Sequence, residues 1–169
     1  MRVILVASPD SGDVERQAFA IAAEIRDSLG RRQPVEAVYA APESEAAEAG
    51  RLVAAELGLP APESRPGLRS PSSRQGAISR LADTIAEVSE DAWAAVEELR
   101  DSHPDEAQVV AVTNATVVYA LVCKALGLPV ESHAHFRIDP GSLSAVTFRQ
   151  QRTILALLNE HCHLKTIDT

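Results

Sequence analysis

RVILVASPDSGD, residues 2–13, is the stretch from which the fold can be worked out. Its residues 3–6 form a continuous apolar run, which is typical of a strand covered on both faces of an α/β sheet. The run breaks into small, polar and turn-forming residues over 7–13, and a helical pattern follows. A strand that opens onto a helix N-terminus in this way is where such folds usually place a ligand. The sequence therefore predicts a binding site at this strand end.

Length and charge limit the classes of protein and partner. The 169 residues, 46% of them hydrophobic, fit a single domain over 1–169 with a substantial core. A net charge of -8 argues against nucleic acid and against an anionic membrane as partners. No segment approaches the roughly 18 apolar residues of a membrane span, and no secretory signal follows Met1, so we expect a cytoplasmic protein. Cys123 and Cys162 are too few for a disulfide framework.

The hydrophobic pattern predicts alternating helices and strands along the chain. Apolar residues at three- and four-residue steps predict helices over 14–29, 42–57, 76–100 and from 113–116 to about 126. Short apolar runs predict further strands over 35–39, 109–112, 136–138, 143–148 and 153–157. Helices alternate with strands early and strands dominate late. This order predicts an α/β fold, a three-layer α/β/α sandwich with a mixed, mostly parallel sheet.

Three local features refine this prediction. Asp10, Ser11 and Asp13 are candidate caps for the first helix. The sequence at 89–91, Ser-Glu-Asp, indicates a break or second start in the third helix. Residues 60–75 contain four prolines and hardly any periodicity, which predicts a long loop of the kind that often serves as a lid, a binding loop or a mobile connection.

The order and the amino-acid sequences of several segments resemble those of the histidine phosphatase superfamily, which has the phosphoglycerate-mutase-like fold. The matching segments cover nearly the whole chain: Arg16-Gln17-Ala18, Val38-Tyr39-Ala40-Ala41-Pro42, Leu57-Gly58-Leu59-Pro60, Ala125-Leu126-Gly127-Leu128-Pro129, the stretch 136–144, and 158–164. No single match is decisive, but six in the right order are fairly specific. The resemblance implies the three-layer fold predicted above.

The family's catalytic positions carry other residues in this chain. The family begins with Leu-Val-Arg-His-Gly-Glu, whose histidine is phosphorylated during turnover, and here residues 5–10 read LVASPD. Its next arginine corresponds to Glu45, and its later Val-Ser-His-Gly corresponds to VTNA at 112–115. Its Leu-Arg-Glu acid loop aligns with Leu-Arg-Ser at 68–70. Arginine, glycine and both histidines are thus replaced together.

These replacements remove the family's chemistry. Phosphoryl transfer through histidine needs an imidazole nucleophile and cationic donors for the phosphoryl oxygens. A carboxylate about 4 Å from a phosphate instead repels it by roughly 1 to 4 kcal/mol. The resemblance therefore implies a non-catalytic member, a pseudophosphatase retained for binding or regulation, with no catalytic residue and no cofactor. Its vestigial pocket would be formed by Ala7, Ser8, Asp10, Glu45, Thr113 and Asn114. Such a pocket suits a neutral or cationic polar molecule better than a phosphate.

Two alternatives stay open. One is a phosphomonoesterase or other hydrolase rebuilt at the same cleft around Ser8, with Arg65, Arg69 or Arg74 from the long loop replacing the lost cations. The other is a structural or regulatory protein that acts through a protein partner or as a homodimer.

Other clusters have simpler interpretations. His161 and His163 on one face of a strand could ligate a metal, as could His133 and His135, but neither pair has a convincing third ligand, so we predict no metal site. The backbone amides of loop 10–13 could cradle an anion, although its two acids oppose a highly charged phosphate. The acids at 43, 45 and 48 are typical of a solvated helix face, except that the resemblance puts Glu45 inside the old pocket.

Overall fold

A computed structural model describes residues 1–10, 12–72, 80–150 and 152–165. Six strands form one sheet in the order β3-β2-β4-β1-β5-β6. The strands are β1 Arg2–Ala7, β2 Ala37–Ala40, β3 Glu63–Ser64, β4 Gln108–Thr113, β5 Leu143–Arg149 and β6 Arg152–Glu160. The α-helices are α1 Val14–Glu24, α2 Ser44–Glu56, α3 Leu81–Ser102, α4 Ala115–Leu126 and α5 Cys162–Lys165. Shorter helical turns are η1 Ile25–Leu29, η2 Pro66–Leu68 and η3 Val130–His135.

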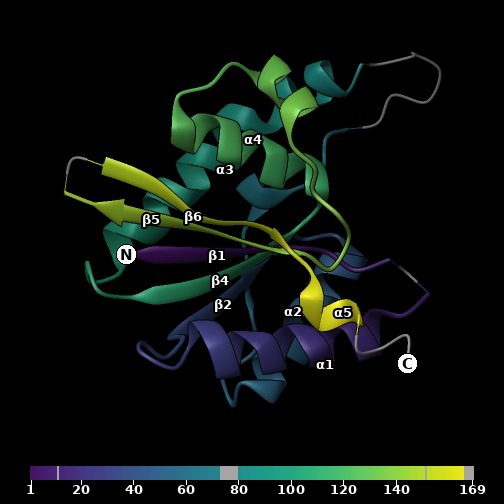
Figure 1. Cartoon of the computed structure of the whole chain (residues 1–169), viewed down its shortest axis with the longest axis vertical. Helices are drawn as coiled ribbons and strands as arrows, with labels where there is room; N and C mark the ends of the chain where they lie inside the picture. The colour runs from purple at the N-terminus through teal and green to yellow at the C-terminus, as the bar shows by residue number, and fades with distance from the viewer. Residues whose placement is uncertain (11, 73–79, 151, 166–169) are drawn as a thin grey trace.

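The sheet lies between two layers of helices, as predicted. Helices α3 and α4 cover one face, and α1, α2 and α5 cover the other (Figure 1). Strands β3, β2, β4 and β1 run parallel, while β5 is antiparallel to both β1 and β6. The two central strands, β1 and β4, are buried along almost their whole length, which explains the uninterrupted apolar run at 3–6. The predicted fold class is confirmed.

Two expected elements differ from the structure. Helix α3 runs without a break through 89–91, because its buried face continues on both sides of that step, from Ile85 and Val88 to Ala92 and Val96. Residues 136–138 form no strand: they follow the turn η3, and the amide of Ile138 bonds to the hydroxyl of Tyr119, 3.0 Å away, instead of to a neighbouring strand. The expected start of α3 at 76–79 lies outside the described residues.

The proline-rich segment is more ordered than its sequence predicts. It contributes β3 to the edge of the sheet and then the turn η2, whose last residue, Leu68, is fully buried. The prolines interrupt any hydrophobic periodicity in this segment, but the buried side chain of Leu68 anchors it in the core. Residues 73–75 of the predicted loop lie outside the described part.

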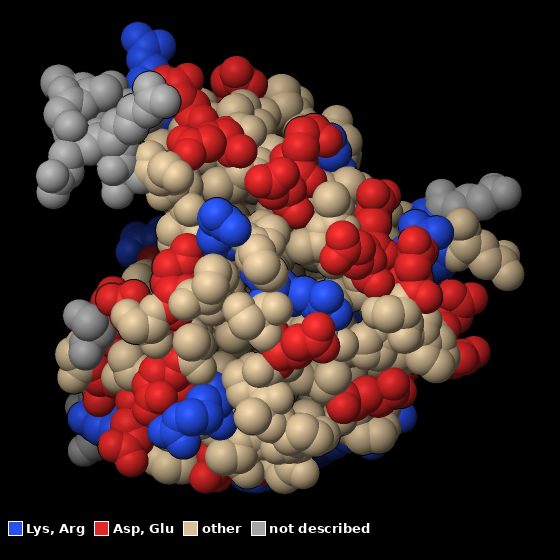
Figure 2. All heavy atoms as spheres, turned by 180° about the vertical axis from the view of Figure 1, so that it is seen from behind, with Lys and Arg blue, Asp and Glu red and all other residues tan. Residues whose placement is uncertain are grey.

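Surface charge agrees with the acidic composition. Figure 2 shows aspartate and glutamate side chains spread over the rear face, among smaller groups of lysine and arginine. This face therefore offers no continuous basic surface for a phosphate backbone. Among the described residues, no helix combines the length and apolar character required to cross a membrane.

Candidate functional site at the carboxyl ends of the strands

A cleft of about 340 Å³ opens where the parallel strands β1, β2 and β4 end. This is the edge at which open α/β sheets place their ligands. Its described lining is formed by residues that follow these strands, by the start of α2, by the turn before β5 and by one residue of the proline-rich segment after η2. These residues are Ser8, Pro9, Asp10, Glu43, Glu45, Ala46, Ser70, Asn114, Ala115 and Pro140.

The floor of the cleft is held by Ser8 and Asn114. The amide of Ser8 donates a hydrogen bond to the carbonyl oxygen of Thr113, 2.6 Å away, and so ties the end of β1 to that of β4. Asn114 caps α4, because its Oδ1 accepts from the amide of Val117 at 3.1 Å. Its Nδ2 donates to Ser70 Oγ at 2.8 Å. Both polar atoms of the Asn114 side chain are therefore hydrogen-bonded within the protein.

Glu43 lines the cleft and ties two of its segments together. Its Oε1 accepts a hydrogen bond from the amide of Ser70, which fastens the proline-rich segment to the start of α2. Its Oε2 is buried and has no hydrogen-bond partner among the described residues. A buried acceptor without a donor costs free energy, on the order of 1–3 kcal/mol. The side chain of Glu43 therefore acts as a tie in the wall of the cleft.

Three carboxylates lie around the cleft, from Asp10, Glu43 and Glu45, and the described lining contains no lysine, arginine or histidine. Each carboxylate about 4 Å from a bound anion would repel it by roughly 1 to 4 kcal/mol, depending on the local dielectric. The same groups attract a cation by a similar amount. The described lining of the cleft is therefore acidic.

The structure brings together four of the six residues expected in the pocket. Ser8, Asp10, Glu45 and Asn114 line the cleft, whereas Ala7 and Thr113 lie beneath it and are not among its lining residues. Both side chains are buried because they belong to the central strands. Thr113 Oγ1 donates to the carbonyl of Leu68 at 2.7 Å, so this hydroxyl already has a structural use.

Sequence reasoning missed the roles of Glu43 and Ser70. Glu43 was expected on a solvated helix face, and this is wrong, because the residue is half-buried and its side chain is aimed at Ser70. The solvated interpretation holds for Glu48, which is exposed and pairs with Arg51 at 2.7 Å. The signal for Glu43 was available: it directly follows the family-like segment 38–42. Ser70 stands where the family's Leu-Arg-Glu acid loop has its glutamate, so the alignment already placed this residue near the family's site.

Two of the loop arginines, Arg65 and Arg69, do not line the cleft. Arg65 lies 5.0 Å from the ring centre of Tyr39 and pairs with Glu63 at 3.2 Å. Arg69 donates to the carbonyl of Pro66 at 3.0 Å, and neither arginine lines the cleft. Arg74 lies outside the described residues, as does Ser11, one of the three candidate caps. Asp13 is the N-cap of α1, without a side-chain capping bond.

The histidines expected on one strand face are placed otherwise. His161 follows β6 and bonds to the carbonyl of Asn159, whereas His163 lies in α5 and bonds to the carbonyl of Gly141 at 3.0 Å. Burial lowers the pKa of His163 from 6.5. His133 bonds to the carbonyl of Val130 within η3. The described residues include no group of three or more histidine, cysteine, aspartate or glutamate side chains that could hold a metal.

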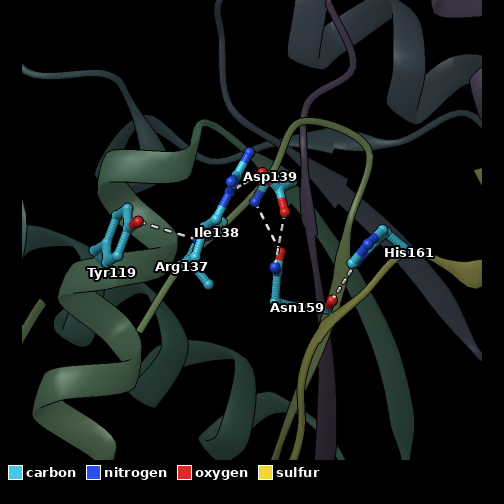
Figure 3. A network of polar contacts seen from close by, with 6 residues as sticks. All are labelled: Tyr119, Arg137, Ile138, Asp139, Asn159 and His161. Carbon is cyan, nitrogen blue, oxygen red and sulfur yellow. Dashed lines mark hydrogen bonds and ion pairs between the residues drawn. The ribbon is translucent and has the colours of Figure 1, made fainter. Parts of the chain in front are cut away.

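A polar network fixes the turn that carries Pro140 into the cleft (Figure 3). Asn159 binds Asp139 twice: its Oδ1 accepts from the Asp139 amide at 2.7 Å, and its Nδ2 donates to Asp139 Oδ2 at 2.9 Å. Arg137 donates to the other carboxylate oxygen. The hydrogen bond from Asn159, followed by that from Arg137, lowers the pKa of Asp139. One wall of the cleft is therefore rigidly attached to β6.

A larger hollow, of about 640 Å³, lies at the opposite end of the sheet. Its lining mixes Arg2, Arg149 and Arg152 with Asp105 and Glu106. It faces the amino ends of the parallel strands, which is not where this fold class binds ligands, and its charges are of both signs. The smaller cleft at the carboxyl ends is therefore the candidate site.

The match to a family model agrees with this geometry. The model of the histidine phosphatase superfamily (branch 1) matches residues 69–161, more than half of the chain. The chain belongs to this superfamily. The resemblance drawn from the six sequence segments is thereby confirmed. No curated protein matches the chain.

Solved structures of histidine-phosphatase folds superpose on nearly the whole chain. Phosphoserine phosphatase from Entamoeba histolytica, in complex with 3-phosphoglyceric acid, has a TM-score of 0.78 at 14% identity and covers 96% of this chain and 98% of its own. The mycobacterial glucosyl-3-phosphoglycerate phosphatase bound to VO3 gives 0.75 at 18%, covering 95% and 99%. The alpha-ribazole phosphatase from Shigella flexneri gives 0.72 at 19%, covering 95% and 96%. At these identities the likeness shows the fold alone.

Proposed function

We propose that this superfamily member is a pseudophosphatase, which does not carry out the phosphohistidine reaction and uses its carboxyl-end cleft to bind a neutral or cationic polar molecule. The observation that carries the proposal is the sign of the charge in the cleft: three carboxylates and, in its described lining, no cation. A phosphate ester brings negative charge, so each of these groups opposes its binding. An ammonium or another hydrogen-bond donor would be attracted instead.

The side chains at the family's catalytic positions support the same proposal. Ser8 stands where the family has its nucleophilic histidine and Asn114 where it has the second one. A serine needs a base to remove its proton, and no described hydrogen bond joins the Ser8 hydroxyl to a base. Asn114 carries no charge and is already engaged with Val117 and Ser70. Neither residue can replace the electrostatic stabilisation that phosphoryl transfer requires.

Ligand binding by the cleft can be tested with simple probes. We expect a diamine such as putrescine to raise the melting temperature of the protein at constant ionic strength, and inorganic phosphate to leave it unchanged. Glu45→Gln should weaken the diamine effect. Glu48→Gln is the matched control, because Glu48 lies on the same helix, is exposed and is outside the cleft lining. Binding of a phosphate ester in the low-micromolar range would contradict the proposal.

A phosphomonoesterase or another hydrolase rebuilt around Ser8 is the alternative. The carboxylates of Asp10 and Glu43 in the same cleft are the groups that could serve such an enzyme as a base. The discriminating measurement is hydrolysis of an aryl phosphate by the wild type and by Ser8→Ala. Turnover that disappears with Ser8→Ala would establish the enzyme and overturn the pseudophosphatase. We expect no turnover that depends on Ser8.

A further inference from the structure

The hollow of about 640 Å³ lies at the end of the sheet opposite the candidate site. Its lining comes from the start of β1, the segment after η1, the loop before β4 and the β5–β6 hairpin, which extends past the start of β1 (Figure 1). Its volume falls within the range of small-molecule sites, roughly 300–1,000 Å³. The hollow shares no lining residue with the cleft, so what it binds is a separate question.

Three arginines of this hollow lie on one face of the sheet. Arg149 and Arg152 are cross-strand partners, in a part of the β5–β6 ladder that is regular, because both register shifts lie over 143–146 of β5. Arg2 is the cross-strand partner of Thr147, two residues before Arg149. Cross-strand partners, and alternate residues of one strand, point to the same face. The three guanidinium groups therefore extend from the same side of the sheet.

Arg2 is held in place by neutral groups. Its Nε donates to Thr147 Oγ1 at 3.3 Å, and its Nη1 donates to Gln108 Oε1 at 3.2 Å. Gln108 is fully buried, and its Nε2 donates to the carbonyl oxygens of Leu29 and Gln33 at 3.2 and 2.9 Å, which fixes its amide. Neither partner of Arg2 neutralises its charge, and a guanidinium has five N–H donors, so further donors are left for a ligand.

Arg149 and Arg152 are exposed, and neither they nor Arg2 form a salt bridge with a described residue. Like charges directly opposite each other on neighbouring strands destabilise a sheet. An anion between the two guanidinium groups would remove this repulsion. Arg100 adds a fourth positive charge, because it lines an adjoining hollow of about 260 Å³ together with Arg149 and Arg152. Its guanidinium lies 6.0 Å from the ring centre of Phe148.

The charges of the hollow select among anions. Its described lining sets three arginine side chains against two acidic ones, Asp105 and Glu106, both of them exposed. A phosphate gathers more than one negative charge on a single group, which the two acids oppose. A molecule with several carboxylates spreads its charge, and each carboxylate can accept two parallel hydrogen bonds from one guanidinium. The lining therefore favours carboxylates over phosphate.

We propose that the hollow at the amino ends of the strands is a second binding site, for a small organic anion that carries two or more carboxylates. Arg2 supplies a guanidinium of fixed orientation, and Arg149 and Arg152 supply the pair between which a carboxylate is held. The proposal does not depend on the function of the cleft, because the two sites lie at opposite ends of the sheet.

Calorimetric titration with citrate, at constant ionic strength, tests the site. We expect citrate to bind the wild type, and Arg149→Gln and Arg152→Gln each to weaken its binding by about fivefold or more, because each removes one attractive charge. Arg51→Gln is the matched control: it removes the same charge at an exposed position outside the hollow and should keep the wild-type affinity. Circular dichroism shows whether each variant folds. No binding of citrate, or an equal loss in all three variants, would overturn the proposal.

Competition tests the chemical class of the ligand. Inorganic phosphate should weaken citrate binding no more than chloride does at the same ionic strength. Specific displacement of citrate by phosphate would show an unselective anion site and overturn the assignment to carboxylates. Glu45→Gln separates this site from the cleft, because Glu45 lines only the cleft and its substitution should leave citrate affinity unchanged. A change in citrate affinity with Glu45→Gln would place citrate in the cleft and refute the proposal.

Discussion

The cleft and the layer of side chains directly beneath it are formed by the same strand ends, but their polar groups are satisfied to different degrees. In the lower layer, Thr113 donates its hydroxyl proton to the carbonyl of buried Leu68, and the backbone of Ala7 bonds to Ser142 and Gly141. In the cleft above, one buried oxygen of Glu43 has no partner among the residues that the structure describes, and three carboxylates lie around one hollow.

This difference predicts which substitutions change the stability of the protein and which change ligand binding. Residues of the lower layer fix where the strand ends lie, so their substitution should lower the free energy of unfolding. Asp10 and Glu45 of the cleft should contribute little to that free energy, since no hydrogen bond to another described residue is assigned to either carboxylate. Substitutions in the cleft should instead change what binds there.

The largest effect is expected for Leu68→Ala. Leu68 is fully buried although its segment is rich in proline, so truncation leaves a cavity and should lower the free energy of unfolding by about 2–5 kcal/mol. Denaturant unfolding followed by circular dichroism measures the loss. Leu81→Ala is the control, since Leu81 is 42% exposed and should change stability by less than about 0.5 kcal/mol. Equal effects of the two variants would mean that the segment does not anchor in the core.

A smaller effect is expected for Thr113→Val. Valine keeps the shape of threonine but leaves the carbonyl of Leu68 without its donor, which should cost about 1–3 kcal/mol of unfolding free energy. Thr84→Val provides the matched control, because Thr84 Oγ1 donates to the carbonyl of Leu81 at 2.8 Å in an exposed position where water can replace it. If the two variants lose the same stability, the bond of Thr113 is not the buried tie described here.

In the cleft, Glu45→Gln should leave stability nearly unchanged and alter binding. Removing one exposed carboxylate near a bound cation removes about 1 kcal/mol of attraction in water-like surroundings, which is about a fivefold loss of affinity. Titration with putrescine by calorimetry, at low salt, measures this change. The same titration with Glu48→Gln should show the wild-type affinity, because Glu48 pairs with Arg51 outside the cleft. An equal loss of putrescine affinity in both variants would indicate a non-specific charge effect.

The sequence predicted most of the fold because its central strands are uninterrupted apolar runs and its main helices have clear amphipathic spacing. The errors arose where local sequence and tertiary packing disagree. Polar residues at 89–91 suggested a helix break, but the buried face of α3 continues past them. Apolar residues at 136–138 suggested a strand, but the amide of Ile138 bonds to Tyr119.

The candidate site was predictable where family motifs supply the position. Ser8, Glu45 and Asn114 all line the cleft, as their aligned positions indicated. Motif alignment does not tell which neighbouring side chain turns inward, so Thr113 was expected in the pocket although its hydroxyl bonds to Leu68. Glu43 was missed because its role depends on the amide of Ser70, which is distant in sequence and reaches it only through the fold.

The smallest effect is expected from the pH dependence of stability at His163, which links α5 to the turn beneath the cleft. Burial lowers the pKa of His163 below 6.5, although the bond to Gly141 and the charges of Glu24 and Glu160 oppose the shift. The unfolded chain therefore takes up a proton before the folded one as the pH falls, so stability is fully present above about 6.5 and decreases below it. Denaturant unfolding between about pH 7 and pH 5 should show a weaker pH dependence for His163→Gln than for the wild type, whereas His135→Gln should keep the wild-type slope.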